Sequence, residues 1–206
     1  MSSQGQIRVY NPSSSAVFLK TREEYGGLSN MAAGYSIEVN GLIVKTSEAL
    51  YQACRYPHLP DVQNIILREH SPMTAKMRSK SFLEQSRPDW DLVRVPIMRW
   101  SLRAKLAQNW EKFGSLLLST GDMPIVEMKT RKIDFWGAKV KEDGSLVGMN
   151  VLGRLLMELR EKLKSNSTDE LRTVRPLNIE NFMLFGEAIG PIEGSRQIRQ
   201  ADMQFN

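Results

Sequence analysis

The stretch from residue 46 to residue 56, TSEALYQACRY, holds side chains whose types and spacing suit acid-base chemistry. Thr46 is a suitable N-cap residue, which places Glu48 in the first turn of a predicted helix. A carboxylate in a first turn interacts favourably with the helix macrodipole, so Glu48 is either an acid that stabilises a helix start or a carboxylate at the mouth of a pocket. In the second case Gln52 and Arg55 lie on the same side of the helix, one and two turns later.

Two further carboxylates, Glu127 and Asp134, stand beside unusual neighbours. A pair of carboxylates across a glycosidic bond stabilises an oxocarbenium-like transition state and protonates a leaving group or activates water. An N-glycosidic bond needs the same help and a ring that holds the base, and Trp90 or Trp136 could stack on it. Such residues occur in every protein of this size, so their spacing alone does not establish glycosidic chemistry.

A basic group follows the helix start predicted at Ser71-Pro72. Lys76 and Lys80 are four residues apart and share a helix face, and Arg78 lies between them in the sequence. This run is either a solvated surface or a phosphate-binding group, because anions bind readily near a helix start. The guanidinium of Arg55 could also hold a phosphate through a bidentate fork.

The 206 residues have the composition of an ordinary globular protein, with 41% hydrophobic residues, 25% charged residues and a net charge of +5. The positive charge favours anionic partners such as nucleic acid or phosphates. The single cysteine, Cys54, excludes a disulfide within the chain and fits a reducing compartment. No apolar run approaches the ~20 residues of a membrane span, and the N-terminus carries no secretory signal. We therefore predict a cytoplasmic protein with no membrane partner.

The sequence lacks the motifs of the common metals and cofactors. His58 and His70 do not have the short spacing of zinc ligands, and one cysteine cannot complete such a set. There is no P-loop, no dinucleotide-binding glycine motif and no nucleophile elbow. We predict no metal and no cofactor, and the sequence argues against P-loop, dinucleotide-dependent and serine-hydrolase chemistry.

Apolar periodicity and turn signals predict the elements that position these side chains. Residues 35–44 give the strongest local pattern, a hairpin closed by a type I′ turn at Asn40-Gly41. The other predicted strands are 7–10, 16–19 and 124–128, and the predicted helices are 46–56, 61–69, one from Pro72, a long one from Pro96, 115–120 and one from near Asn150. The apolar stripe of the long helix consists of Met98, Leu102, Leu106, Trp110 and Phe113.

The C-terminal part of the chain differs from the rest, and we divide the sequence into a domain, 1–164, and a polar linker and tail of unknown role, 165–206. The tail contains one apolar segment, 179–185, that could dock back on the domain. From residue 194 onward the composition predicts disorder.

Seven stretches resemble, in order, the motifs of the NADAR superfamily, which includes the YbiA-type N-glycosidases. They are residues 25–31 (YGGLSNM), 46–53 (TSEALYQA), 71–77 (SPMTAKM), 89–90 (DW), 116–121 (LLLSTG), 134–137 (DFWG) and 148–157 (GMNVLGRLLM). The resemblance covers about residues 17–164. It implies a compact, mostly helical α+β domain with a small antiparallel sheet, no metal, and cleavage of an N-glycosidic bond to ribose.

The resemblance also implies roles for particular residues. The catalytic residues carried over from the family motifs are Glu48, Trp90 and Asp134. We expect the two carboxylates to share the acid-base and cation-stabilising work, and Trp90 to pack on the base or ribose. Which carboxylate is the acid stays open.

Eight further residues are candidates for substrate binding. They are Ser29, Asn30, Gln52, Arg55, Lys76, Trp136, Gly137 and Asn150. Lys76 could hold a phosphate or form a covalent intermediate with the opened sugar. Asn150 could hydrogen-bond a ribose hydroxyl or position Asp134. Ser29 and Asn30 follow two glycines that can bring backbone close to a ligand, although the segment taken alone is more typical of a plain loop.

The chain departs from the family motifs at three places. Met31 stands where phenylalanine is frequent, Arg55 stands where lysine is frequent, and Arg78-Ser79 stands where a glycine often follows the alanine-lysine pair. These changes alter the shape of the expected pocket and leave the substrate open.

Family members divide by substrate, and so do our hypotheses. Some members cleave phosphorylated intermediates of riboflavin synthesis, whereas others remove ADP-ribose from guanine bases of DNA and so reverse a toxin's modification. The basic balance favours the second class, with ADP-ribosylated DNA or an ADP-ribose-like nucleotide as partner. The alternatives are the small-metabolite N-glycosidase and a non-catalytic ADP-ribose-binding module. The presence of both Glu48 and Asp134 argues against the latter.

Overall fold

The structure is a computed structural model that describes residues 6–130, 135–165 and 168–194. The α-helices in this part are α1 Ser47–Ala53, α2 Pro60–Arg68, α3 Pro72–Lys80, α4 Trp90–Gln108, α5 Trp110–Ser119, α6 Val151–Lys164 and α7 Thr168–Arg172. The strands are β1 Arg8–Tyr10, β2 Ala16–Phe18, β3 Ile37–Val39, β4 Leu42–Val44, β5 Ile125–Lys129, β6 Ala138–Val140, β7 Leu146–Gly148, β8 Thr173–Val174, β9 Met183–Leu184, β10 Glu187–Ala188 and β11 Ile192–Glu193. None of these helices is both long and apolar enough to span a bilayer.

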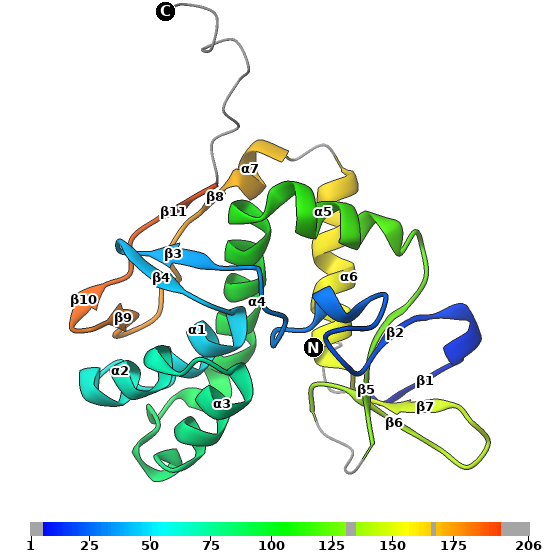
Figure 1. Cartoon of the computed structure of the whole chain (residues 1–206), viewed down its shortest axis with the longest axis horizontal. Coiled ribbons are helices and arrows are strands. Elements are labelled where there is room, and N and C mark those ends of the chain that lie inside the picture. The colour runs from blue at the N-terminus through cyan, green and yellow to red at the C-terminus, as the bar shows by residue number, and fades with distance from the viewer. Residues whose placement is uncertain (1–5, 131–134, 166–167, 195–206) are drawn as a thin grey trace, which may run out of the picture.

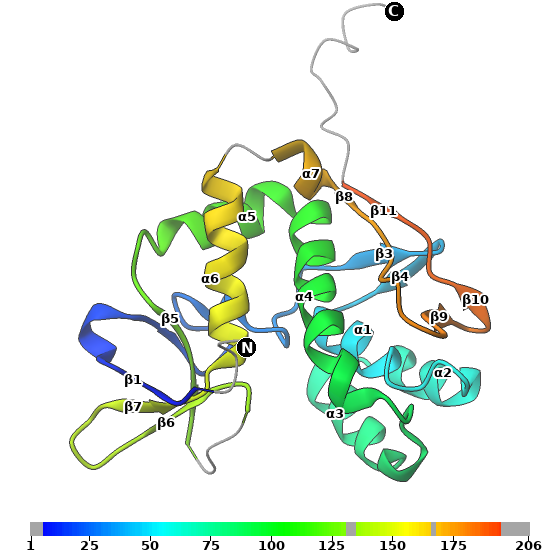
Figure 2. The ribbon, with the colours of Figure 1, turned by 180° about the vertical axis from the view of Figure 1, so that it is seen from behind.

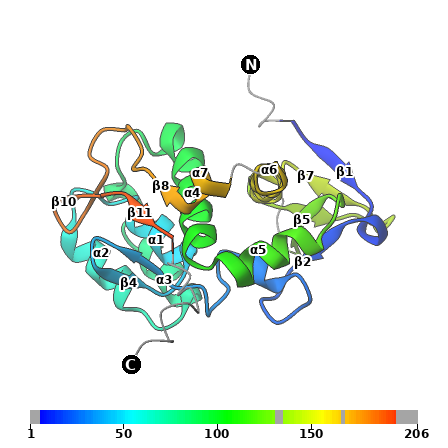
Figure 3. The ribbon, with the colours of Figure 1, turned by 90° about the horizontal axis from the view of Figure 1, so that it is seen from above.

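Two groups of elements lie on either side of the long helix α4 (Figures 1 and 3). One group contains α1, α2, α3, the β3–β4 hairpin and the strands β8 to β11. The other contains the five-stranded sheet and α6, with α5 running across between the groups. Most of the buried apolar side chains form one continuous cluster that passes through both groups.

The α+β fold class is confirmed, with small antiparallel sheets formed by β3–β4, β8–β11 and β9–β10. The largest sheet, in the order β1-β7-β6-β5-β2, is mixed. Strand β5 pairs in parallel with both β2 and β6, whereas β7 pairs antiparallel with β1 and β6. The β2–β5 pair can be parallel because most of the helices lie between these strands in the sequence.

The hairpin and helix start that precede Glu48 are formed as predicted. Asn40 and Gly41 have φ values of 49° and 76°, the left-handed pair that a type I′ turn requires. The Thr46 hydroxyl accepts a hydrogen bond from Ala49 N at 3.2 Å, which caps α1. Every residue of α1 is buried, so the helix is held on all sides and its first turn is fixed in place.

The expected start of the long helix at Pro96 is wrong. Helix α4 begins six residues earlier, at Trp90, and Pro96 lies inside it. The first turn forms because Leu92 N donates to Asp89 O at 2.9 Å and because Trp90 and Val93 are buried against the core. Proline fixes a helical φ and removes one donor, a loss that the packing of this turn outweighs.

The apolar stripe predicted for one helix is divided between two. Asn109 leaves the helical conformation between α4 and α5, with φ −123° and ψ 44°. Its side-chain amide donates to Ser36 O at 3.0 Å and to Lys105 O at 3.1 Å. An asparagine side chain that bonds to backbone competes with the helical pattern, so the chain turns here and Trp110 and Phe113 belong to α5.

Part of the chain beyond residue 164 belongs to the same hydrophobic core. The buried apolar residues of this part are Leu171, Val174, Phe182, Leu184, Ile189 and Ile192. Two of them come from the apolar segment 179–185, and α7 begins inside the segment predicted as a polar linker. The described tail therefore packs along α4 (Figure 2).

Candidate active site

Glu48 is a buried carboxylate held by three neighbours. Its side chain is only 5% exposed, and its backbone N–H donates to Asn30 O at 3.1 Å. Gln52 Nε2 donates to its Oε1 at 2.9 Å, and Lys76 Nζ lies 3.6 Å from the same oxygen. A carboxylate that is buried, hydrogen-bonded and ion-paired is fixed in one orientation, as a group acting on a substrate must be.

The amide of Gln52 is oriented by helix α3. Ser79 Oγ donates to Gln52 Oε1 at 2.6 Å, which leaves the NH₂ group facing Glu48. Ser79 is in turn held by the Tyr56 hydroxyl, which donates to Ser79 O at 2.6 Å. In the sequence, Ser79 stands out only as a departure from the family motif. Its role depends on the contact between α1 and α3, which no local pattern reveals.

The predicted ligands Ser29 and Asn30 are buried and bond to protein groups. Asn30 Oδ1 accepts from Ser47 Oγ at 3.1 Å, and its Nδ2 donates to Met98 Sδ at 2.7 Å. Ser29 Oγ accepts from Met31 N at 3.2 Å. These bonds fix the loop against the start of α1 and so position Glu48. Contact of either side chain with a substrate stays a prediction.

Lys105, which the sequence did not predict as a site residue, anchors the same loop from α4. It is fully buried in α4, and its Nζ donates to Gly27 O at 2.6 Å and Ser29 O at 3.0 Å. The ammonium lies 4.4 Å from the centroid of the Tyr35 ring. Burial lowers its pKa well below the ordinary value. The sequence feature that could have indicated this buried lysine is its position within the otherwise apolar residues 104–107.

Aromatic rings from three elements gather beside α1. The Tyr51 centroid is 5.0 Å from that of Trp90 and 5.7 Å from that of Trp136. Phe135 packs edge-on to Trp136 at 5.1 Å. Trp90 is 8% exposed, with Arg55 4.9 Å above its ring, whereas Trp136 is half-buried. The structure therefore brings Trp90 and Trp136 together through Tyr51, and Trp136 has the more accessible ring.

The Tyr51 hydroxyl lies within electrostatic reach of Glu48. Burial, and after it the negative charge of Glu48, raises the pKa of Tyr51 far above its ordinary value. The hydroxyl therefore stays protonated at all physiological pH values. Tyr51 lies within the family motif at residues 46–53, but its position in an apolar segment indicated only packing.

The predicted basic residues separate in the structure. Lys76, with 36% of its side chain exposed, faces Glu48. Arg55 Nε donates to Ser86 Oγ at 2.6 Å. Arg78 instead forms an ion pair with Glu69 at 2.9 Å. Lys76 is thus the cation of the predicted group that lies nearest to the buried carboxylate.

Asn150 and Gly137 both contact the backbone of β5. Asn150 is fully buried with a left-handed φ of 47°, its Nδ2 donates to Ile125 O at 2.8 Å, and its Oδ1 accepts from Glu127 N at 3.1 Å. Contact of this side chain with a ribose hydroxyl stays a prediction. Gly137 is buried, and a Cβ there would lie 2.5 Å from Glu127 O. Both residues fasten the start of α6 and the end of the DFWG motif to the sheet.

Asp134, the second predicted carboxylate, lies outside the described residues. The two residues after it are fixed at the start of α6, because Val151 N donates to Phe135 O at 3.3 Å and Leu152 N donates to Trp136 O at 3.0 Å. Within the described ranges, no three histidine, cysteine, aspartate or glutamate side chains are grouped as metal ligands would be. Among the described residues, the groups of this site that could act on a substrate are the Glu48 carboxylate, the Lys76 ammonium and the aromatic rings beside α1.

Comparison with known proteins identifies the family of this chain. The NADAR domain model matches residues 17–164. The chain is 38% identical over 146 residues to the N-glycosidase YbiA of Escherichia coli, covering 71% of this chain and 86% of that protein. It is 31% identical to an N-glycosidase of Nostoc punctiforme, covering 72% and 92%. It is 34% identical over 166 residues to a riboflavin biosynthesis protein of Vibrio vulnificus, covering 81% and 41%. The NMR structure of E. coli YbiA superimposes with a TM-score of 0.63 at 34% identity, covering 76% and 89%.

Proposed function

Because the chain belongs to the NADAR family, we propose that it hydrolyses an N-glycosidic bond to ribose and that its substrate is ADP-ribose linked to guanine bases of DNA. The observation that carries this proposal is the buried Glu48 carboxylate, held by Gln52 and Lys76 beside the Tyr51–Trp90–Trp136 rings. Two relatives that bear the name N-glycosidase align with 71% and 72% of this chain.

The proposed reaction breaks the bond between the ribose anomeric carbon and the base nitrogen. The electron pair leaves with the base, and the sugar becomes an oxocarbenium-like cation that a fixed carboxylate stabilises. One carboxyl group donates its proton to the departing nitrogen. Water then adds to the anomeric carbon, keeps one hydrogen as the new hydroxyl and passes its other proton to a carboxylate. Glu48 and Asp134 share these roles in the proposal, and a ring holds the leaving base.

Several features support a phosphate-bearing, DNA-linked substrate. The chain has a net charge of +5, and Lys76 places an ammonium beside Glu48 while remaining partly exposed. Arg55 adds a guanidinium over the Trp90 ring. Such cations attract the phosphates of ADP-ribose and of the DNA strand.

The test is release of ADP-ribose from an ADP-ribosylated DNA oligonucleotide, followed by mass spectrometry of both products. Glu48→Gln should lower kcat by about 10³-fold, because the amide cannot stabilise a cation or carry a proton. Unmodified guanine should be restored in the DNA. No release by the wild type at micromolar enzyme would refute the DNA substrate.

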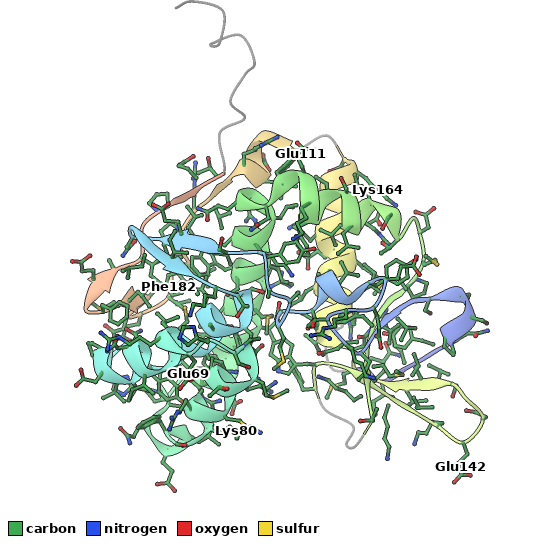
Figure 4. All side chains as sticks on the ribbon, in the orientation of Figure 1. Glu69, Lys80, Glu111, Glu142, Lys164 and Phe182 are labelled. Atoms are coloured by element: carbon green, nitrogen blue, oxygen red, sulfur yellow. The ribbon has the colours of Figure 1, made fainter. Side chains whose placement is uncertain are left out.

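Glu69→Gln is the matched control for Glu48→Gln. Glu69 directly follows α2 and is labelled in Figure 4, and its partly exposed carboxylate pairs, among the described residues, with the exposed Arg78. The same change of charge there should leave kcat within about twofold, since exposed ion pairs contribute little. If Glu48→Gln and Glu69→Gln were equally active, Glu48 would have only a structural role.

A second candidate function follows from the Vibrio relative, whose name places it in riboflavin biosynthesis. It is N-glycosidic cleavage of a phosphorylated ribosylamino-pyrimidine, which would use the same carboxylate and the Lys76 ammonium. Turnover of that metabolite, without turnover of ADP-ribosylated DNA, would favour this function. Binding of ADP-ribose by calorimetry with no product formed would instead indicate a non-catalytic module.

A further inference from the structure

Arg94, on α4, carries a cation near the candidate site to which the proposed reaction gives no role. Its guanidinium carbon lies 4.2 Å from the centroid of the Phe135 ring, and 30% of its side chain is exposed. Its Nε atom is shielded from solvent and has no hydrogen-bond acceptor in the described part of the chain. Its ion-pair partner, Asp91, is 86% exposed and lies 3.5 Å from that Nε. Arg94 is thus a cation held in place by stacking, with a buried donor that has no acceptor among the described residues.

The other two cations of the site are engaged more closely by the protein. Lys76 Nζ lies 3.6 Å from the buried Glu48 carboxylate, which offsets its charge. Arg55 Nε donates to Ser86 Oγ at 2.6 Å. Arg94 differs from both, because an ion pair with a largely exposed carboxylate is screened by water and contributes little. Among these three cations, Arg94 is the one best able to bind an anion from solution.

A row of aromatic rings connects Arg94 with the helix that carries the carboxylate. From Phe135 the row continues to Trp136, with 5.1 Å between the ring centroids, and from Trp136 to Tyr51, with 5.7 Å between them. Tyr51 lies three residues after Glu48 in α1, on the same side of the helix. The row therefore joins the two groups of elements that flank α4 (Figure 1).

The Tyr51 hydroxyl lies within electrostatic reach of both ends of this row. Burial is the main cause that raises the pKa of Tyr51, and the negative charge of Glu48 raises it further, whereas the positive charge of Arg94 lowers it. Arg94 and Glu48 therefore act on one common point. A ribosyl compound with its anomeric carbon at Glu48 and its rings on the aromatic row would direct its phosphate toward Arg94.

We propose that Arg94 binds the phosphate of the ribosyl substrate and so determines which ribosyl compounds enter the site. A guanidinium stacked on a ring still presents the N–H groups of its edge, which match phosphate oxygens in a bidentate fork. Bound phosphate would supply the acceptor that Nε lacks. The inference rests on the proposed function for the ribosyl part of the ligand. The phosphate chemistry is the same for a nucleoside diphosphate sugar and for a ribose phosphate monoester.

The test is calorimetric titration of the full chain with ADP-ribose and, separately, with ribose 5-phosphate. Arg94→Gln should weaken binding about tenfold or more, because a hydrogen bond to a charged group is lost. Arg94→Lys should weaken it less, by about threefold, because an ammonium keeps the charge but not the fork. Thermal unfolding confirms that each variant is folded, and Arg94→Lys carries the test if Arg94→Gln does not fold.

Arg103→Gln is the matched control. Arg103 lies nine residues later on α4, about 13 Å along the helix axis, and its Nε is also buried without an acceptor among the described residues. Its Nη2 donates to Glu170 O at 3.0 Å, in the tail. Arg103→Gln should change binding of either ligand by less than about twofold, because charges at that separation are screened.

The outcomes separate this inference from the proposed function. Weaker binding in Arg94→Gln but not in Arg103→Gln supports the inference, whether or not ADP-ribosylated DNA is cleaved. The ligand that shows this difference identifies a diphosphate or a monoester as the group bound. Unchanged binding in Arg94→Gln, equal weakening in Arg103→Gln, or no binding of either ligand by the wild type overturns it. Cleavage of ADP-ribosylated DNA with an unchanged KM in Arg94→Gln overturns the inference alone and leaves the proposed function standing.

Discussion

At the scale of single residues, two buried titratable groups organise the site from opposite ends. Glu48 is held by Gln52 and Lys76, whereas Lys105 holds the carbonyls of the loop that contacts the start of α1. Burying a charge is costly unless it is bonded, and each of these is bonded to groups on other elements. The fold thus fixes the loop and the carboxylate together.

Gln52→Leu should uncouple the carboxylate from its support. The change keeps the approximate volume but removes the bonds to Glu48 and Ser79, so we expect a loss of about 1–3 kcal/mol in the free energy of unfolding. We expect kcat to fall about tenfold or more, because Glu48 loses its fixed orientation. Urea unfolding and steady-state kinetics measure the two effects.

Gln63→Leu provides the control for this variant. Gln63 is equally buried, and its side chain bonds to Ala53 O, Met183 O and Phe185 N, away from the carboxylate. It should lose similar stability and keep kcat at temperatures where it is folded. A parallel loss of kcat in both variants would mean that Gln52 contributes only stability.

Lys105 should make stability depend on pH. Its pKa is lowered by burial, so between that lowered value and the ordinary value of 10.5 the unfolded chain binds more protons than the folded one. The free energy of unfolding should therefore rise with pH in this window, by at most about 1.4 kcal/mol per unit. Lys105→Met should lack this rise when urea unfolding is compared at pH 7, 8.5 and 10. If the free energy of unfolding varied with pH in the same way in the wild type and in Lys105→Met, Lys105 would not be the group that causes the rise.

At the scale of elements, local signals determined what the sequence could predict. The Asn40-Gly41 turn and the Thr46 cap were predictable because each depends on residues a few positions apart. The start of α4 was missed because burial of Trp90 outweighed the preference of Pro96 for a helix start. The division of α4 from α5 depends on a bond from Asn109 to a distant strand segment, which periodicity cannot show.

In the candidate site, too, features that depend on local sequence were predictable and contacts between distant residues were not. Glu48, Gln52 and Lys76 were predicted from the resemblance and come together in the structure. Ser79 and Lys105 were missed because their partners lie 27 and 76 to 78 residues away in the sequence. Contacts of that separation are set by how helices pack, not by a motif.

The contact between α6 and β5 should be intolerant of a single methyl group. A Cβ at Gly153 would lie 2.1 Å from Ile125 O and 2.5 Å from Asn150 Nδ2, so Gly153→Ala must displace the sheet or the Asn150 side chain. We expect a loss of about 3 kcal/mol and weaker activity, because the same contact fixes Trp136. Thermal unfolding and kinetics provide the measurements.

Gly114→Ala is the opposite case within α5. A Cβ there would lie 3.6 Å from Leu106 and Leu163 side-chain atoms, an ordinary contact. Alanine in a helix interior should add about 0.5–1 kcal/mol of stability. If both alanine variants changed stability in the same direction, close backbone approach at Gly153 would not be the cause.

At the scale of the whole molecule, the segment after residue 164 connects the core to the site. Trp100 on α4 donates its indole N–H to Arg175 O at 3.1 Å and packs edge-on to Phe182 at 4.9 Å. Arg87, three residues before Trp90, donates to Glu180 O at 2.5 Å. The described tail therefore supports both the middle of α4 and the turn from which α4 begins.

Truncation after Lys164 should consequently affect activity as well as stability. It would uncover a face of α4 and remove the buried side chains that the segment adds to the core, each worth about 1.5–3 kcal/mol. Because the truncated chain could fail to fold, Phe182→Ala in the full chain is the more informative variant, with an expected loss of about 3–5 kcal/mol. Glu187→Ala, on an exposed residue of β10, should change stability by less than about 0.5 kcal/mol. A Phe182→Ala protein with the wild-type melting temperature would mean that the tail only rests on the domain and that residues 17–164 fold and act without it.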